Sequence, residues 1–372
     1  MVKKLIIYVA KFIYCFFKLL PTKNKVTMIS RQSNEKTIDF ALLEDKLNKE
    51  IKTVILCHKL EGGINASFLE KIKYVLHCLS QMYHIATSKV IVLDSYCILI
   101  SILKHKKSLK VIQMWHSMGT MKKFGYQILD KSEGSKKEVA ELMKMHKNYD
   151  YVFASSMAYA KQLEEGFNCG MDKIRIYSLP RVDLLTSKKY KEETTKRIKE
   201  KYPNILEKEN IVYCPTFRKN EKELEKEIYR IIKKIDFEKY NFIIKLHPLS
   251  KIQISDNRII YDKEFSSMDM LFVANYIISD YSCIIYEASI LNIPMFFFAF
   301  DLEEYLDNRG LTIDYKKELP GIVSKNSSDI INAIENKNYD LNLVLEFRKK
   351  YVTNVENCTE EIVNFIEKII NE

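Results

Sequence analysis

The chain has 372 residues, which is long enough for two domains of ordinary size, each with its own core. Its hydrophobic fraction of 47% and charged fraction of 29% are typical of a globular protein and exclude a disordered or fully membrane-embedded chain. Eight scattered cysteines without a CxxC pair indicate a reducing compartment, with neither disulfides nor a zinc site. The net charge of +10 favours an anionic partner: nucleic acid, an anionic membrane or a phosphorylated substrate.

The first twenty residues predict an amphipathic helix. The run Leu5–Leu20 is almost entirely apolar, whereas Lys4, Lys11 and Lys18 recur every seven residues and share one side of a helix. The run is shorter than the ~20 residues that span a bilayer, and Lys11 sits at its middle. Residues 1–20 are therefore expected to lie in the interface of an anionic membrane. The alternative is a helix packed on the protein's own surface or on a second subunit, which leaves a homo-oligomer open.

After Pro21 the sequence alternates between short apolar strands and helical segments, a pattern that predicts parallel sheets covered by helices on both faces. The predicted strands are 26–30, 53–57, 90–93, 110–115, 151–154, 211–214, 241–246, 259–261, 276–278 and 295–298. The predicted helices are 37–48, 68–79, 96–103, 136–147, 157–167, 222–235, 267–273, 282–291 and a C-terminal helical region, 344–371, with Asn357 as the candidate for a break.

The stretch 186–210, rich in Lys and Glu, is the predicted bridge between two α/β domains. The expected organisation is a membrane-associating helix at 1–20, an N-terminal domain at 21–190, a C-terminal domain at 205–345 and a helical region at 346–372. Two successive domains of parallel type would form a cleft at the carboxyl ends of their strands, where open sheets bind ligands.

Two histidines follow predicted strands directly. His116 comes after an apolar strand, beside the only tryptophan of the chain, and Gly119 behind it permits a tight turn. His247 precedes Pro248, which ends its strand, so this ring is expected at the strand tip. A histidine at such a place can act as a general base near neutral pH, although a lone one is more often a structural hydrogen-bonding hub.

Basic side chains gather at further strand ends. Arg218 in Cys-Pro-Thr-Phe-Arg and Arg181 in Pro-Arg-Val-Asp carry guanidinium groups, which suit phosphate. With Lys122 and Lys123 they supply donors for an anion, and no acidic cluster competes for a metal. A P-loop and a GxGxxG motif are both missing, which disfavours ATPase and dinucleotide-binding functions.

The stretch Asn275–Pro294 reads as a strand, a polar cluster and a helix. The cluster is Ser279, Asp280, Tyr281 and Ser282. Backbone N–H groups at the start of a helix suit a diphosphate, while an ordinary N-cap is an equally good interpretation of this stretch alone.

Taken together, these motifs resemble the CDP-glycerol glycerophosphotransferase family of teichoic acid biosynthesis, and most closely its short, primase-type members. The matching pieces span roughly residues 25–325 in the family's order. They are Ile-Ser-Arg-Gln-Ser at 29–33, the block 113–125, Pro-Arg-Val-Asp at 180–183, Cys-Pro-Thr-Phe-Arg at 214–218, Lys-Leu-His-Pro at 245–248, Ser-Asp-Tyr-Ser at 279–282, Phe-Asp-Leu-Glu-Glu-Tyr at 300–305, Arg-Gly at 309–310, Asp-Tyr at 314–315 and Leu-Pro-Gly at 319–321.

The resemblance implies a GT-B fold with two Rossmann-like domains. It implies transfer of a polyol phosphate from CDP-glycerol, or a similar CDP-polyol, to a polyprenyl-diphosphate-linked saccharide at the cytoplasmic face of the membrane. Because phosphoryl transfer depends mostly on positioning and charge stabilisation, the motif residues require no metal, and no cofactor is expected. His116 and His247 correspond to the family's catalytic-site histidines. The residues that the resemblance places at the donor are Arg218, Lys245, Ser279, Asp280, Ser282 and Arg309. Those placed at the acceptor or at phosphate are Gly119, Lys122, Lys123 and Arg181.

The sequence departs from the family pattern at a few positions, which leaves the donor and acceptor open. Phe217 stands where Trp is usual, Lys219 where Asp often follows the arginine, and Cys283 where a second Ser is usual. Two other functions stay open: a GT-B glycosyltransferase that uses a nucleotide sugar, and a non-catalytic module that binds a glycopolymer at the membrane surface. Nucleic acid is the least expected partner because the basic residues are dispersed.

Overall fold

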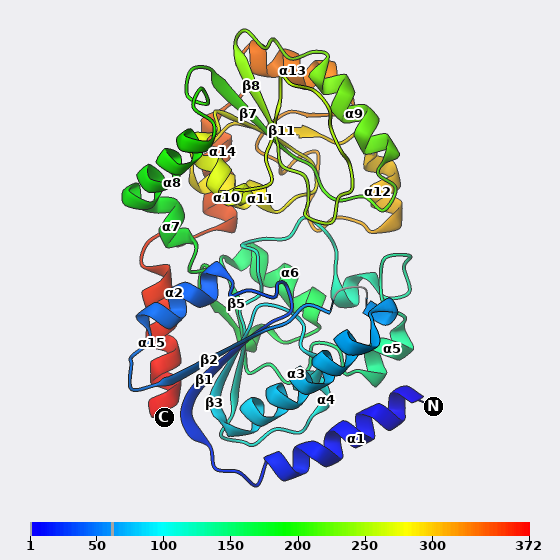
Figure 1. The fold of residues 1–372 in the computed structure, drawn as a ribbon, viewed down its shortest axis with the longest axis vertical. Coiled ribbons are helices and arrows are strands. Elements are labelled where there is room, and N and C mark those ends of the chain that lie inside the picture. The colour runs from blue at the N-terminus through cyan, green and yellow to red at the C-terminus, as the bar shows by residue number, and fades with distance from the viewer. Residues whose placement is uncertain (1, 61–62) are drawn as a thin grey trace. The chain divides into compact units, whose positions relative to one another are not determined.

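The computed structural model describes residues 2–60 and 63–372, so Met1 of the predicted N-terminal helix lies outside the described residues (Figure 1). The chain forms two compact units. The N-terminal unit contains residues 1–117, 124–183 and 356–372, and the C-terminal unit contains residues 118–123 and 184–355. Each unit is built on its own sheet.

The sheet of the N-terminal unit has six strands within the described residues, all paired in parallel in the order β2-β1-β3-β4-β5-β6. The strands are β1 (Lys23–Ser30), β2 (Lys52–Cys57), β3 (Ser88–Leu93), β4 (Lys110–Gln113), β5 (Tyr151–Ala154) and β6 (Ile174–Ile176). The α-helices are α1 (Val2–Phe17), α2 (Ile38–Lys46), α3 (Phe68–Thr87), α4 (Ile98–Ile102), α5 (Lys137–Leu142), α6 (Met157–Phe167), α7 (Val182–Thr186), whose last residues belong to the C-terminal unit, and α15 (Cys358–Asn371).

The sheet of the C-terminal unit also has six parallel strands in the described part of the chain, in the order β12-β11-β10-β7-β8-β9. The strands are β7 (Glu209–Cys214), β8 (Tyr240–Ile244), β9 (Ile260–Tyr261), β10 (Tyr276–Ser279), β11 (Met295–Phe298) and β12 (Val323–Ser324). The α-helices are α8 (Lys188–Lys201), α9 (Lys222–Ile232), α10 (Ser267–Met270), α11 (Ile284–Ile290), α12 (Leu302–Asn308), α13 (Ser327–Glu335) and α14 (Leu341–Tyr351).

The predicted parallel α/β architecture is confirmed in both units. The central strands read as nearly continuous apolar runs because helices cover both faces, and every residue of β10 and β11 is buried. The sequence did not predict β6 and β12, since strands of three and two residues are too short to show a period. The helix predicted at 136–147 ends at Leu142, and Lys144, His146 and Asn148 beyond it adopt positive φ angles.

The bridge stretch and the C-terminal region are more ordered than expected. Ser187 caps α8, whose Tyr190 hydroxyl donates to Asp269 at 2.9 Å within the C-terminal unit. The predicted C-terminal helical region is two helices. α14 packs against α11, whereas α15 returns to the N-terminal unit and lies along α2 (Figure 1). Both carboxylate oxygens of Asp183 accept from the first N–H groups of α15, at 2.8 Å each.

Helix α1 has two apolar faces. Ile7, Ala10 and Tyr14 are buried in the core of the N-terminal unit, and α1 lies beside α3 (Figure 1). The opposite face stays exposed, and Phe12 and Phe16 on it are 66% and 58% accessible. The helix therefore packs on the protein's own surface, as one alternative predicted, and still presents an apolar face outward.

Candidate active site

His116 lies at the carboxyl end of the N-terminal sheet, just after β4. Its ring packs against Trp115 with centroids 4.5 Å apart. Its Nδ1 is 2.9 Å from the backbone carbonyl oxygen of Asp94, which follows the neighbouring strand β3. The side-chain amide nitrogen of Gln32 lies 3.3 Å from the same atom, and the carbonyl is the nearer partner. A carbonyl can only accept, so Nδ1 donates to it, and the neutral ring carries its lone pair on Nε2. Burial lowers the pKa of His116 below its usual value and keeps the ring unprotonated, and so able to accept a proton, near pH 7.

Arg181 is part of a buried ion pair in the same unit. Its Nε donates to both carboxylate oxygens of Asp39, at 3.2 and 3.0 Å, its NH2 pairs with the same group, and its backbone N–H adds a bond of 2.9 Å. Asp39 is buried on α2. Both charges act on His116 with opposite effects on its pKa, and Arg181 is the one that lowers it. Arg181 therefore anchors the turn after β6 beside His116.

In the C-terminal unit, Arg218 joins two carboxylates that are far apart in the sequence. Its NH1 donates to Asp280 at 2.5 Å, while Nε and NH2 donate to Asp301 at 2.9 and 3.0 Å. Asp280 is fully buried and also accepts from the backbone N–H of Thr216, at 2.9 Å. Tyr281 donates to Asp301 at 3.0 Å and stacks on the ring of Tyr305. These contacts fix the loops that follow β7, β10 and β11.

The polar cluster before α11 is mostly inside the protein. Ser279 is buried and donates to the carbonyl oxygen of Cys214 at 3.1 Å, and Asp280 accepts from the next backbone N–H. Ser282 is half-buried, and its hydroxyl accepts from the N–H of Ile284 at 3.4 Å. The side chains of this stretch therefore brace the loop, whereas the N-cap of α11 is Cys283, whose side chain makes no capping hydrogen bond.

His247 and Lys245 follow β8, the neighbour of β7. His247 is exposed, and its Nδ1 accepts from the backbone N–H of Leu249 at 3.1 Å, so the neutral ring carries its proton on Nε2. Its ring lies 5.6 Å from that of Phe217, in the loop of Arg218. Lys245 is buried and donates to Asp262, whose carboxylate it pairs with, and to the carbonyl of Phe265. Lys245 thus holds the loop that carries His247.

The segment 118–123 follows His116 closely and belongs to the C-terminal unit. Lys122 forms an antiparallel bridge with Leu311, and the N–H of Lys123 donates to Gly310 at 3.1 Å. Gly119 packs flat on the ring of Tyr286, where a Cβ would lie 2.3 Å from ring carbons.

Two basic side chains accompany that segment. Arg309 donates through Nε to the carbonyl oxygen of Lys123 at 3.2 Å. Lys122 lies 5.9 Å from the centroid of Tyr305, and burial lowers its pKa to about 8. The pKa of Lys122 also responds to the charges of Asp280, Arg309 and Arg218. Lys122 therefore lies near the ion pairs that Arg218 makes with Asp280 and Asp301.

The sequence-predicted residues thus fall into two sets. The N-terminal unit holds His116 and Arg181, and the C-terminal unit holds the other candidates. Sequence reasoning missed Asp39, Asp94, Asp262 and Asp301 as partners of these residues. A single carboxylate carries no pattern of its own, and Asp301 lies 83 positions from Arg218. The only available signal was its place inside the motif at 300–305.

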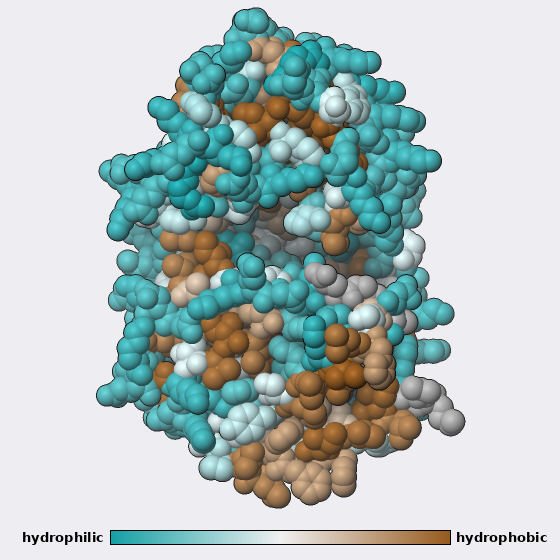
Figure 2. All heavy atoms as spheres, in the orientation of Figure 1, coloured by the Kyte–Doolittle hydropathy of each residue, from teal (hydrophilic) through white to brown (hydrophobic). Residues whose placement is uncertain are grey.

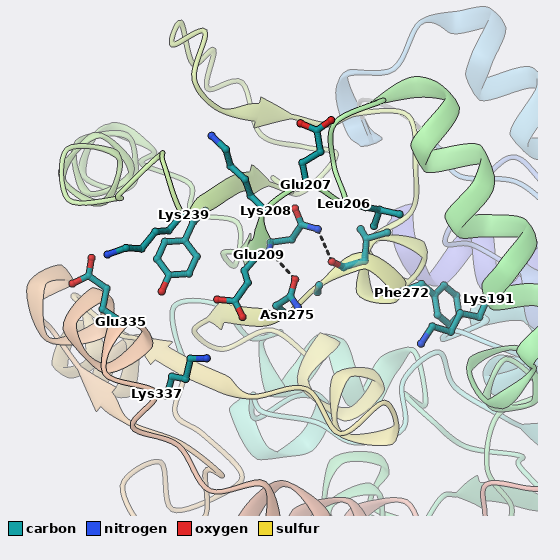
Figure 3. Close-up of a pocket in the computed structure, with 14 residues that line it drawn as sticks. Lys191, Leu206, Glu207, Lys208, Glu209, Lys239, Phe272, Asn275, Glu335 and Lys337 are labelled. Carbon is teal, nitrogen blue, oxygen red and sulfur yellow. Dashed lines mark hydrogen bonds between the residues drawn. The ribbon is translucent and has the colours of Figure 1, made fainter.

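A cavity of about 910 Å³ lies elsewhere in the C-terminal unit, at the amino ends of β7, β8 and β10 (Figure 3). Lysines and glutamates such as Lys208, Glu209 and Lys239 line it (Figure 3). Asn210 and Asn275 also line it, and the backbone N–H of Asn210 donates to the side chain of Asn275 at 2.8 Å. Open parallel sheets bind ligands at the carboxyl ends of their strands. None of the candidate residues lines this cavity, and they remain candidates at the carboxyl ends of the strands.

Neither a metal site nor a membrane span emerges from the described residues. Within 2–60 and 63–372, no group of three or more His, Cys, Asp or Glu side chains is placed to hold a metal ion. No helix in the same ranges is long and apolar enough to cross a membrane.

Comparisons with known proteins agree with the motifs. The family described as CDP-Glycerol:Poly(glycerophosphate) glycerophosphotransferase matches residues 12–368. A teichoic acid glycerol-phosphate primase of Bacillus subtilis is 30% identical, over 98% of this chain and 97% of its own. A teichoic acid ribitol-phosphate primase of Bacillus spizizenii is 26% identical, over 95% of this chain and 93% of the primase. A poly(ribitol-phosphate) polymerase of Bacillus spizizenii is 28% identical, and the match covers 97% of this chain but 59% of the polymerase.

Solved structures show the same fold. The wall teichoic acid polymerase TagF superposes with a TM-score of 0.77 at 17% identity, covering all of this chain and 96% of that chain. The UDP-GlcNAc 2-epimerase of Methanocaldococcus jannaschii gives a TM-score of 0.61 at 16% identity, covering 92% of this chain and 99% of the epimerase chain. The expected GT-B-like architecture is thereby confirmed. The chain is an enzyme of the CDP-glycerol:poly(glycerophosphate) glycerophosphotransferase family.

Proposed function

We propose that the protein transfers glycerol phosphate, or a closely related polyol phosphate, from a CDP-linked donor to a hydroxyl of a polyprenyl-diphosphate-linked saccharide. The observation that carries the proposal is the pair of strand-end histidines held in opposite tautomers. His116 offers a lone pair at Nε2, as a base needs, and His247 offers a proton at Nε2, as a developing negative charge needs.

The reaction needs one proton transfer and one displacement at phosphorus. The acceptor oxygen attacks the polyol-bearing phosphorus while His116 Nε2 takes the hydroxyl proton. The bond from that phosphorus to the CMP oxygen breaks, and its electron pair leaves with CMP. The growing charge on CMP is met by His247 and by the cationic residues of the C-terminal unit.

The C-terminal unit is proposed to bind the donor through its half-buried cations. Lys122 and Arg309, with the backbone around Ser282, are the groups proposed to contact the diphosphate. Arg218 and Asp280 bind each other and hold the loop in place. Lys123 and Arg181 are proposed to act on phosphate at the acceptor side.

We further propose primase-type addition of one or a few polyol phosphates. The two primases are matched over nearly their whole length, whereas the polymerase is matched over 59% of its own. Because one of those primases is named for glycerol and the other for ribitol, the proposal covers both CDP-polyols.

Association with the cytoplasmic face of the membrane is also part of the proposal. The exposed face of α1 continues onto α3, where Phe68 is 79% accessible, and Figure 2 shows apolar side chains gathered over these helices. The exposed apolar residues are Leu5, Ile6, Tyr8, Val9, Phe12, Phe16, Leu19, Leu20, Phe68, Leu69, Ile72, Val75 and Leu76. Lys3, Lys4, Lys71 and Lys73 are exposed along the same two helices, and a surface of this kind suits an anionic bilayer.

Substitution of the two histidines tests the chemistry. His116→Asn and His247→Asn are each expected to lower CMP release from CDP-glycerol or CDP-ribitol by about a hundredfold or more. His105→Asn is the matched control, since that ring packs against Tyr14 far from the strand ends. If both variants at the strand ends turn over at the wild-type rate, the proposed function is wrong.

A further inference from the structure

The carboxyl end of β3 carries a buried acid that the proposed reaction does not use. Asp94 is 2% exposed, and neither carboxylate oxygen has a hydrogen-bond partner among the residues that the structure describes. The hydroxyls of Ser30 and Ser95 accept from the backbone N–H groups of Gln32 and Arg31, and they lie close enough to favour the ionised carboxylate without reaching hydrogen-bonding distance. A buried carboxylate without partners costs stability, so a fold that keeps one gains something else from it.

Several charged or titratable groups face Asp94. The pKa of Asp94 is raised to about 6, chiefly by burial; the two serine hydroxyls and Arg181 lower it, and the Asp39 carboxylate raises it. Cys57 at the end of β2 also senses this charge: burial raises the pKa of that thiol most, and Asp94 raises it further. Because Asp39 and Arg181 are paired with each other, their fields at Asp94 oppose one another.

Asp94 is bound to His116 through its own backbone. The carbonyl oxygen that accepts from Nδ1 of His116 belongs to the same residue as the unpartnered carboxylate. Covalent geometry therefore limits the carboxylate to within about 8 Å of Nδ1. In a desolvated site, a negative charge at that distance favours an imidazolium over a neutral imidazole.

We propose that Asp94 is a positioning residue for His116, fixing its tautomer through the carbonyl and stabilising its protonated ring through the carboxylate. This inference rests on the proposed function, in which His116 is the base. During the reaction the acceptor proton moves to Nε2 and the ring becomes positive. Asp94 stays ionised and takes no proton. The Asp94 carboxylate thus gains a positive charge nearby when the reaction protonates His116.

The variant Asp94→Asn keeps the shape and removes the charge. We expect the plateau of kcat against pH to fall tenfold or more, with the melting temperature at pH 7.5 unchanged or higher. The acid limb of the profile should change from two ionisations, those of His116 and Asp94, to one. Asp150→Asn is the matched control. That carboxylate directly precedes β5 and accepts from the N–H of Val111, at the amino ends of the strands, whereas Asp94 lies at their carboxyl ends. A plateau within twofold of wild type together with an unchanged acid limb would overturn the proposal.

Two further measurements keep the outcomes apart. If Asp94→Asn does not fold, the acid limb of the unmodified enzyme decides: two ionisations support the role of Asp94, and one refutes it. His116→Asn separates this inference from the proposed function. Activity retained in that variant refutes the base itself, whereas activity lost there but kept in Asp94→Asn refutes only the role of Asp94.

Discussion

At the scale of single residues, hydrogen bonds decide what each histidine can do. His116 donates from Nδ1 to a carbonyl, and His247 accepts at Nδ1 from an N–H group, so identical side chains have opposite chemistry at Nε2. The sequence showed both histidines at strand ends. Their tautomers could not be predicted, because the partners, Asp94 and Leu249, are set by the turns.

Asp94 should make the fold less stable as pH rises. Its pKa is raised from 3.8 to about 6, so the folded state binds this proton more tightly than the unfolded state does. The resulting loss of stability begins near pH 4 and is complete above pH 6. A difference of about two between the folded and unfolded pKa values corresponds to about 3 kcal/mol of unfolding free energy. Asp94→Asn is therefore expected to match wild type at pH 4 and to exceed it at pH 7.5. Urea unfolding at pH 4 and at pH 7.5 checks this. The prediction is wrong if the variant and the wild type differ by the same unfolding free energy at the two pH values.

Arg218 should be a major contributor to stability. Its removal leaves the buried Asp280 and the partly buried Asp301 without their cation, which typically costs 3–5 kcal/mol. Arg218→Met is expected to lower the free energy of unfolding by about that amount in urea. Arg258→Met is the matched control, since its guanidinium is exposed and an exposed ion pair contributes little to stability. Similar losses in both variants would mean that the buried network adds nothing.

Lys122 should make donor binding depend on pH. Its pKa is about 8, so the cation is present below that value and is lost as pH rises through it. If it binds the diphosphate, the affinity for CDP-glycerol should fall by about tenfold per pH unit above pH 8. Calorimetric titrations between pH 7 and 9.5 measure this dependence. Lys122→Arg, which stays charged, should abolish it, and an unchanged slope in that variant would exclude Lys122.

At the scale of elements, long and regular segments were the predictable ones. The strand at 295–298 and the helix at 157–167 were predicted with the observed bounds, because an apolar run and a helical period mark them. The segment 118–123 could not be predicted. Its strand-like bridge joins residues 189 positions apart, and no local pattern encodes such a pairing.

The packing of that segment depends on a residue without a side chain. In Gly119→Ala the added Cβ would lie 2.3 Å from carbons of Tyr286, whose buried ring is stacked on Phe347. Overpacking of this kind costs about 1–3 kcal/mol. Gly119→Ala is expected to lower stability by that amount in urea, and Tyr286→Leu in the same chain should recover part of the loss. Additive effects of the two changes would show that the contact is unimportant.

The exposed faces of α1 and α3 should bind vesicles. Replacing Phe12, Phe16, Phe68 and Leu69 with serine removes exposed apolar area and leaves the buried face of α1 intact. Each apolar side chain buried in lipid contributes about 1.5–3 kcal/mol, so binding to anionic vesicles should fall by a hundredfold or more. Leu343→Ser, on α14 of the C-terminal unit, is the control. Sedimentation with the vesicles measures binding, and undiminished binding would place the contact on another surface.

At the scale of the whole molecule, sequence motifs gave the family and the architecture, and the structure added the partners of each motif residue. The sequence places Ser279, Asp280 and Ser282 at the donor, and the structure adds that their side chains hydrogen-bond within their own loops. Conversely, Asp94 had no motif signal, because an unpartnered buried carboxyl is visible only once its surroundings are known.

The most direct test of the central claim follows both products of the reaction. The full-length protein is incubated with a lipid-linked saccharide and, in turn, CDP-glycerol, CDP-ribitol and nucleotide sugars. The amount of CMP released is quantified, and the mass of the lipid-linked product is measured by mass spectrometry. We expect one CMP released for each polyol phosphate gained by the acceptor, with few units added per acceptor. An acceptor that gains a hexose from a nucleotide sugar, or binds without any CMP release, would contradict the account.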